Sequence, residues 1–247
     1  EAVGCVEKLH ASVAQKSVNL ALGFTASLFD GMSLTVDLYS IEIKDQFYAT
    51  SAITVTPSIK AALISAKIPG ADTIGQVQFF QNAFDSKTEG VDLVVSYTQD
   101  WGGFGETAFS TNLNYNKFSI EKVNIANLFF EEDVFDFENG APEIRGVFTA
   151  QHEIGPFTGL FRASYYGDYT VSNCLTGNGT DGFTCRTDAD DPLNNRPPTA
   201  YPQGLTKQEM PAEVLFDLEF GWDVTDELAV AVGARNVLDT YPKEGNP

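Results

Sequence analysis

The sequence predicts an all-β fold, an antiparallel up-and-down meander of about eight long strands that forms part of a transmembrane β-barrel. Three observations support this prediction. Apolar and polar residues alternate with period two through most of the chain, short connections alternate with long ones, and aromatic residues flank the short connections. Alternation with period two is typical of a strand that has one apolar and one polar face.

The alternation marks eight segments. The clearest of them puts Val214, Phe216, Leu218, Phe220 and Trp222 on one face, while acidic residues lie on the other. The predicted strands lie within residues 17–29, 33–43, 77–97, 106–117, 143–154, 157–169, 213–222 and 228–235.

The connections between these segments differ in length in a regular way. Short turns are expected at 30–31, 100–105, 155–156 and 224–226, and long excursions at 48–75, 119–140 and 170–210. Alternate connections of a meander lie at opposite ends of the sheet. All short turns should therefore lie at one end and all long loops at the other, which is the arrangement of outer-membrane barrels.

The two faces of the predicted strands differ in a way that favours a membrane. Ring-bearing residues near the short turns, Phe29, Trp101, Phe104, Phe157 and Trp222, fit a belt at the lipid headgroups. A soluble, half-buried sheet gives the same binary pattern. The polar face favours a roomy aqueous lumen, because it carries asparagines and many charges: Asp37, Asp92, Glu106, Arg145, Arg162, Asp217, Glu219 and Arg235.

Composition limits the function classes. With 34 acidic against 15 basic residues and a net charge of −19, the chain has no basic stripe for nucleic acid. No apolar run approaches the roughly 18 to 20 residues of a membrane helix. The chain does not begin with Met and shows no signal peptide. We therefore expect it to be a piece of a longer protein.

The closing segment "FDLEFGWDVTDELAVAVGARNVLDTYP" resembles the penultimate hairpin of TonB-dependent outer-membrane receptors, whose second strand ends in an Asn-Leu-Phe-Asp-like motif, here 236–239. The segment "QFFQNAFDSKTEGVDLVVSY" is similar to another recurring strand of that family, through Asn82, Ala83 and 90–93. The resemblance extends from about Lys16 to Pro242. It implies an upstream segment at 1–16 and a partial barrel at 17–247, in the bacterial outer membrane. The plug domain, the TonB box and the final aromatic strand of the family are absent from the sequence, and the family's barrels have about 22 strands.

The resemblance implies the import of a scarce, bulky nutrient, such as a ferric siderophore, cobalamin or an oligosaccharide. Long loops and the upper lumen wall capture ligand in such receptors, and aromatics on loops also pack loops together. The candidate contacts are Phe129, Phe130, Tyr166, Tyr169, Phe183 and Tyr201. The implied partners are outer-membrane lipid, the nutrient, and the TonB complex through the absent plug.

The sequence shows no catalytic motif, so we expect neither an enzyme nor a cofactor. Cys174 and Cys185 flank a short polar loop and could form a disulfide or remain free thiols, and Cys5 is left over. The acidic runs at 131–138 and 187–191 favour solvated loops over cation sites, so no metal is expected. His152 lies on an apolar face, which favours packing over ligation, and 57–68 could form a short helix.

Two other functions stay open at this point. A barrel that is not energised, such as a porin, an adhesin or an autotransporter pore, would lack a plug upstream. A soluble all-β binding module would be monodisperse without detergent, whereas an open barrel fragment would aggregate through its unpaired edges.

Overall fold

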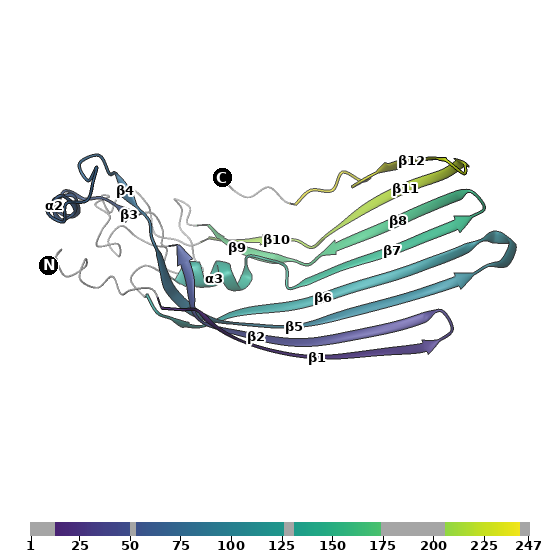
Figure 1. Ribbon diagram of the computed structural model, residues 1–247, viewed down its shortest axis with the longest axis horizontal. Helices are drawn as coiled ribbons and strands as arrows, with labels where there is room; N and C mark the ends of the chain where they lie inside the picture. The colour runs from purple at the N-terminus through teal and green to yellow at the C-terminus, as the bar shows by residue number, and fades with distance from the viewer. Residues whose placement is uncertain (1–12, 50–52, 126–130, 174–205, 243–247) are drawn as a thin grey trace.

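The computed structural model describes residues 13–49, 53–125, 131–173 and 206–242. Eight strands form one antiparallel sheet in the order of the chain, β1-β2-β5-β6-β7-β8-β11-β12 (Figure 1). Their bounds are β1 Lys16–Phe29, β2 Met32–Ala49, β5 Phe80–Asp100, β6 Glu106–Val123, β7 Ile144–Ile154, β8 Phe157–Tyr166, β11 Glu213–Thr225 and β12 Leu228–Ala234. The predicted meander of eight strands is confirmed.

The two ends of the sheet differ, as the loop lengths predict. The hairpin turns lie together at one end, and the longer connections lie at the other (Figure 1). Asp30 and Gly31 alone close the first hairpin, with Gly31 at φ +79°. The long connections carry α2 (Pro57–Ser65), α3 (Glu131–Asn139) and two small ladders, β3 (Ile53–Thr54) with β4 (Gln76–Val77) and β9 (Tyr169–Asn173) with β10 (Thr206–Met210).

Helix α2 confirms the predicted short helix, although it ends at Ser65 rather than at 68. Pro57 occupies its first turn, and the Thr56 hydroxyl accepts a hydrogen bond from the Ile59 N–H at 3.3 Å. None of the helices in the described ranges is long and apolar enough to cross a membrane.

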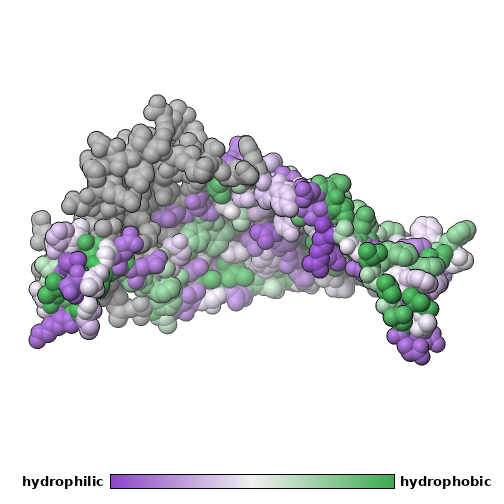
Figure 2. All heavy atoms as spheres, turned by 90° about the horizontal axis from the view of Figure 1, so that it is seen from above, coloured by the Kyte–Doolittle hydropathy of each residue, from purple (hydrophilic) through white to green (hydrophobic). Residues whose placement is uncertain are grey.

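One face of the sheet carries a continuous apolar belt. Across five strands, Leu22, Leu38, Val91, Tyr115 and Ile144 lie directly opposite one another. Nearer the turns, ring contacts run from Phe29 through Tyr97, Phe109, Phe148 and Phe161 to Phe216, with centroids 5.8 to 6.3 Å apart. Hydrophobic residues gather on the surface toward the short-turn end (Figure 2).

The apolar belt is exposed in the chain itself. Leu22 is 71% exposed, Phe24 62% and Val232 70%. A face of this extent is not left in water by a soluble protein. The 11 residues of β7, which run entirely within the belt, match the 9 to 11 that a tilted strand needs to cross a bilayer. The predicted aromatic girdle is also present, since Trp101, Phe157 and Trp222 lie at the turn end and are each more than 40% exposed.

Strands β2, β5 and β6 extend past the belt. In this region the belt side of the sheet becomes charged and the opposite side becomes apolar. The residues 42–49, 80–90 and 116–123 form this upper extension. Its face in line with the belt carries Glu42, Lys87, Glu89 and Lys117. Its opposite face carries Phe84, Phe118 and Ile120, which pack with Tyr48 and with Val134 and Phe137 of α3. Ala83 and Phe84 are fully buried.

This exchange explains why the predicted ends of β2 and β6 come too early, and the start of β5 also differs from the prediction. Strand β2 continues to Ala49, β5 begins at Phe80 rather than at 77, and β6 continues to Val123, inside the loop predicted at 119–140. The same predicted loop contains α3, and the loop predicted at 170–210 begins and ends in the β9–β10 ladder. In the upper extension the polarity of the alternation reverses and β-bulges interrupt its period, so the sequence pattern resembles the end of a strand.

Candidate functional site

Helix α3 packs on the face of the upper extension that carries Phe84 and Phe118, at the end of the sheet with the long connections. The Phe137 ring lies 5.1 Å from the ring of Tyr48, 5.3 Å from Phe84 and 6.0 Å from Phe118, between centroids. The Glu138 carboxylate accepts a hydrogen bond from the Ile120 N–H at 2.8 Å. These contacts fix α3 on the upper extension.

The acidic run that favoured a solvated loop is therefore a docked helix, and this corrects the prediction. Its apolar residues Val134 and Phe137 are three positions apart, so they lie on one side of the helix. Burial behind α3 and the nearby Asp133 carboxylate raise the pKa of Tyr48. The spacing of Val134 and Phe137 was the sequence signal that could have identified the helix.

A cavity of about 320 Å³ opens where the end of α3, the start of β7 and the β8–β9 link meet. Such a volume is at the lower end for small-molecule pockets. The Gly167 N–H donates to the Ile144 carbonyl at 2.8 Å and holds the β8–β9 link against β7. The lining includes Glu138, Glu143, Ile144, Tyr165, Asp168 and Tyr169.

The two predicted ligand contacts that the structure describes lie at this junction but in different settings. Tyr169 begins β9 and lines the cavity. Tyr166 is the last residue of β8, between Arg145 and Glu213 on the polar face, so it belongs to the strand wall rather than to a loop. Phe129, Phe130, Phe183 and Tyr201 lie outside the described residues, as do Cys174, Cys185 and Cys5.

The polar face below α3 carries a row of polar side chains at one register level. It runs from β2 to β11 through Asp37, Asp92, Asn114, Arg145, Tyr166 and Glu213. The Asn114 amide donates to the Asp92 carboxylate at 2.6 Å and to the Tyr39 hydroxyl at 3.2 Å. Asp37 and Asp92, two like charges, lie directly opposite each other. A row of this polarity suits an aqueous interior.

The Asn-Val-Leu-Asp motif at 236–239 forms a closed turn after β12. Asn236 adopts φ +50°, which asparagine tolerates better than most residues. Its side chain accepts from the Thr240 N–H at 3.0 Å and donates to the Thr240 carbonyl at 2.8 Å. The Asn236 N–H donates to Asp217, which also forms an ion pair with Arg162 at 3.7 Å. The motif therefore ties the end of β12 to β11.

The Asn-Ala motif that begins at Asn82 fixes an irregularity in β2. Asp45 adopts φ +56° in a bulge, and its N–H donates to the Asp85 carboxylate at 2.9 Å. The Asn82 amide donates to the Asp45 carbonyl at 2.5 Å and exchanges two hydrogen bonds with the backbone of Val13. The Asp45 N–H, with the Asn124 amide, lowers the pKa of Asp85 against the opposing effect of burial.

His152 forms part of a hydrogen-bond chain near the turn end of the belt. The Trp101 indole N–H donates to the Thr107 hydroxyl at 2.9 Å, and that hydroxyl lies 2.8 Å from His152 Nδ1. Thr107 is only 8% exposed. This arrangement agrees with the predicted packing role of His152. In the described part of the chain, no group of three or more His, Cys, Asp or Glu side chains could hold a metal ion.

Comparison with known families identifies one match. Residues 13–237 match the family described as "TonB dependent receptor-like, beta-barrel". A comparison with curated proteins finds no match.

Solved structures share the fold of the chain. The outer membrane transporter YddB from Escherichia coli has a TM-score of 0.62 and 10% identity, over 92% of this chain and 29% of that one. The FrpB iron transporter from Neisseria meningitidis (F5-1 variant) has a TM-score of 0.57 and 15% sequence identity, over 94% of this chain and 28% of the transporter. The ferripyoverdine receptor of the Pseudomonas aeruginosa outer membrane has a TM-score of 0.51 and 14% sequence identity, over 92% of this chain and 24% of the receptor. The chain thus spans less than a third of the length of each of these proteins.

Proposed function

The chain belongs to the TonB-dependent receptor β-barrel family, and we propose that it forms part of the wall of an importer for a scarce, bulky nutrient. The family and its solved neighbours are outer-membrane proteins of Gram-negative bacteria, which places this chain in the same membrane. The proposed ligand classes are a ferric siderophore, cobalamin or an oligosaccharide. Two of the structural neighbours are an iron transporter and a ferripyoverdine receptor, which supports the first class most directly.

The observation that carries the proposal is the different chemistry of the two faces of one sheet. The belt face needs lipid, because its side chains are apolar and exposed. The opposite face carries the polar row from Asp37 to Glu213 and, above it, α3. The cavity lined by Tyr169 opens at the edge of the sheet beside α3, where Ile144 and Tyr165 of the belt face also line it. A wall with these two faces separates hydrocarbon from a water-filled passage, and α3 lies at the mouth of that passage.

We propose that Tyr169 and Tyr166 contact the incoming ligand. Tyr169 lines the cavity, and Tyr166 lies on the polar face at the same end of the sheet, between Arg145 and Glu213. Aromatic rings with a hydroxyl bind both apolar and polar parts of a large ligand at little cost in side-chain entropy. The plug domain, supplied from outside this sequence, would lie against the polar row and couple import to TonB.

The test is growth of a bacterial strain that lacks its own outer-membrane importers and expresses the full-length protein of which this chain is a part. Each culture receives a single source of the limiting nutrient: a ferric hydroxamate, a ferric catecholate, cobalamin or a maltooligosaccharide. Growth on one source that disappears when TonB is deleted supports the proposal. Growth on small solutes of any kind, independent of TonB, would instead support a porin-like barrel that is not energised.

Point variants then test the ligand contacts. Replacement of Tyr169 or Tyr166 by Ala should weaken binding of the active nutrient about fivefold to thirtyfold, because each ring contributes about 1–2 kcal/mol. Tyr115→Ala is the matched control, since Tyr115 lies on the belt face and is 40% exposed. Equal loss in all three variants would assign the effect to barrel stability and not to ligand contact.

A further inference from the structure

The cavity beside α3 has a lining with charges of one sign. Among the described residues that line it are three acidic ones, Glu138, Glu143 and Asp168, and none that is Lys, Arg or His. Two aromatic residues, Tyr165 and Tyr169, line the same space. A volume of about 320 Å³ has room for a small organic group but not for a whole bulky nutrient.

Backbone contacts hold the walls of this cavity in place. The Glu143 carbonyl accepts a hydrogen bond from the Asn116 N–H at 2.8 Å, which fixes the start of β7 against β6. The β8–β9 link is fixed by Gly167, whose N–H donates to the Ile144 carbonyl. A Cβ on residue 167 would lie 3.0 Å from that carbonyl oxygen, so glycine suits this close approach. Since α3 is docked on the upper extension, the third wall is fixed as well, and the cavity is built into the fold.

The acidic side chains of the cavity have acceptor sites that the described part of the chain does not use. Neither Glu143 nor Asp168 forms a side-chain hydrogen bond or an ion pair within the described ranges. Glu138 has one partner, because one of its carboxylate oxygens accepts from the Ile120 N–H at 2.8 Å. An ionised carboxylate offers about four lone-pair sites. Most of the acceptor sites at the cavity are thus open to a donor from outside the chain.

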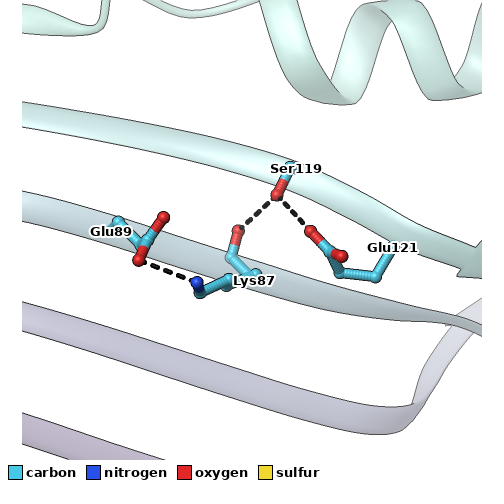
Figure 3. Close-up of polar contacts among 4 residues, drawn as sticks. All are labelled: Lys87, Glu89, Ser119 and Glu121. Carbon is cyan, nitrogen blue, oxygen red and sulfur yellow. Dashed lines mark hydrogen bonds and ion pairs between the residues drawn. The ribbon is translucent and has the colours of Figure 1, made fainter.

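Two acidic residues of the upper extension show the contrast. The Glu89 carboxylate forms an ion pair with the Lys87 ammonium group at 2.8 Å (Figure 3). On the neighbouring strand, the Glu121 carboxylate accepts a hydrogen bond from the Ser119 hydroxyl at 3.0 Å (Figure 3). The unpaired carboxylates are therefore a local property of the cavity and do not follow from the general excess of acidic residues in the chain.

The C-terminal end of α3 adds to the negative potential at the cavity. Glu138 and Asn139 belong to the last turn of this helix and line the cavity. The last carbonyl groups of a helix carry a partial negative charge, which a basic residue in the last turn can offset. The last turn of α3 contains no basic residue. The helix end and the three carboxylates together make the cavity attractive to a positive charge.

We propose that this cavity binds an organic monocation, that is, an ammonium or guanidinium group on a small carbon skeleton. Carboxylates accept charge-assisted hydrogen bonds from the N–H groups of such a cation, and tyrosine rings attract its charge. A metal ion fits less well, because no group of three or more His, Cys, Asp or Glu side chains among the described residues could hold one. The inference goes beyond the proposed function, since the same chemistry applies to a group of the nutrient and to a separate solute.

The first experiment measures binding of n-butylguanidinium to the purified full-length protein in a neutral detergent by isothermal titration calorimetry. The cavity variant E143Q/D168N removes two charges and keeps the size of the side chains. The matched control is E106Q/E153Q, which removes two carboxylates that lie directly opposite each other at the turn end. The cavity variant should bind about tenfold more weakly or worse, because it loses charge-assisted hydrogen bonds, and the control should bind like the wild type.

Two comparison ligands identify the chemistry that the cavity recognises. Neutral n-butanol should bind the wild type far more weakly than n-butylguanidinium, and potassium chloride should not displace the guanidinium compound beyond ordinary salt screening. Equal affinity of the cavity variant and the wild type for n-butylguanidinium would overturn the proposal. An equal loss in E106Q/E153Q would also overturn it, because the general acidity of the protein would then be the cause.

The melting temperature separates binding from folding. E143Q should raise the melting temperature slightly without the cation, because it removes repulsion among like charges around one cavity. Saturating n-butylguanidinium should raise the melting temperature of the wild type, and that of E143Q by less. An E143Q variant that melts lower than the wild type under both conditions would show a structural role for Glu143 and would contradict the proposal.

Competition with the nutrient identifies the source of the cation. Displacement of n-butylguanidinium by the nutrient that supports growth would show that the cation is a group of that nutrient, and binding of both together would assign the cavity to a separate solute. A protein that binds the cation but imports nothing would overturn the proposed function and support this inference. An importer that does not bind the cation would overturn this inference alone.

Discussion

The ring of Tyr39 packs directly over Gly90 on the neighbouring strand. Gly90 is the glycine of the Gly-Val-Asp-Leu segment. The two residues are directly opposite in the β2–β5 register. A Cβ on residue 90 would overlap Cζ and Oη of Tyr39 and would lie 2.6 Å from the Tyr115 carbonyl oxygen. With the ring in this position, the Tyr39 hydroxyl accepts a hydrogen bond from Asn114, two strands away.

Gly90→Ala should therefore lower the free energy of unfolding by about 1–3 kcal/mol, the usual cost of overpacking. Denaturant unfolding in detergent measures the effect. The double variant Gly90→Ala/Tyr39→Ala should recover part of the lost stability, because the clash with the Tyr39 ring is removed. The recovery should be incomplete, because the Tyr115 carbonyl oxygen remains close. Gly159→Ala is the control, because a Cβ there meets nothing within 4 Å. If G159A costs as much as G90A, the Tyr39 contact is not the reason for the glycine.

Asp85 should make the stability of the chain depend on pH at the acid end. Its pKa is lowered in the folded state, chiefly by the Asp45 N–H, below the ordinary value of 3.8. The stabilisation is therefore present above pH 3.8 and is lost as the pH falls through the folded pKa. Discounted for partial exposure, it amounts to about 1 kcal/mol.

A comparison of the wild type with Asp85→Asn checks this expectation. The difference in unfolding free energy should be steady near pH 7 and should shrink below pH 3.8. Asp226→Asn, at an exposed position in the last hairpin turn, is the control substitution. If the difference in unfolding free energy between the wild type and D85N stays the same in acid, the charge of Asp85 is not the source of the stabilisation.

The Trp101–Thr107–His152 chain should hold the Trp101 indole at the turn end of the belt. Thr107→Val keeps the side-chain shape and removes both hydrogen bonds, so we expect a loss of about 1–2 kcal/mol. Trp222→Phe leaves Trp101 as the only tryptophan of the chain, and its fluorescence anisotropy should then fall in T107V. Thr111→Val, at another position on the belt face, should leave the anisotropy unchanged.

Phe137 should control whether α3 stays docked on the upper extension. Truncation of a well-packed Phe typically costs about 3–5 kcal/mol, and the partial exposure of Phe137 reduces this to about 2–3 kcal/mol. We expect Phe137→Ala to speed amide hydrogen exchange in 131–139 far more than in β7 or β8. Phe104→Ala, in a turn and 76% exposed, is the control. Uniform acceleration over the whole sheet would mean that α3 is not a separately docked element.

The sequence by itself determined the all-β class, the number of strands and the sorting of turns from loops. Period-two alternation depends only on neighbouring residues, and short hairpins such as Asp30-Gly31 are local signals. It also located Tyr166 and Tyr169 at the end of the sheet that carries the long connections, because loop length identifies that end of the strands. The family motifs could be identified in the sequence, but their structural roles could not.

The tertiary structure decided what depends on the neighbouring strand. Only the β2–β5 register puts Tyr39 over Gly90, and only the β1–β2 register sets Lys16 against Lys44. The upper extension could not be read from the alternation, because α3 packs on its inner face and thereby reverses which side is apolar. The sequence of a single strand shows that its two faces differ in polarity. Whether each face contacts solvent, lipid or a helix depends on the elements that pack around the strand.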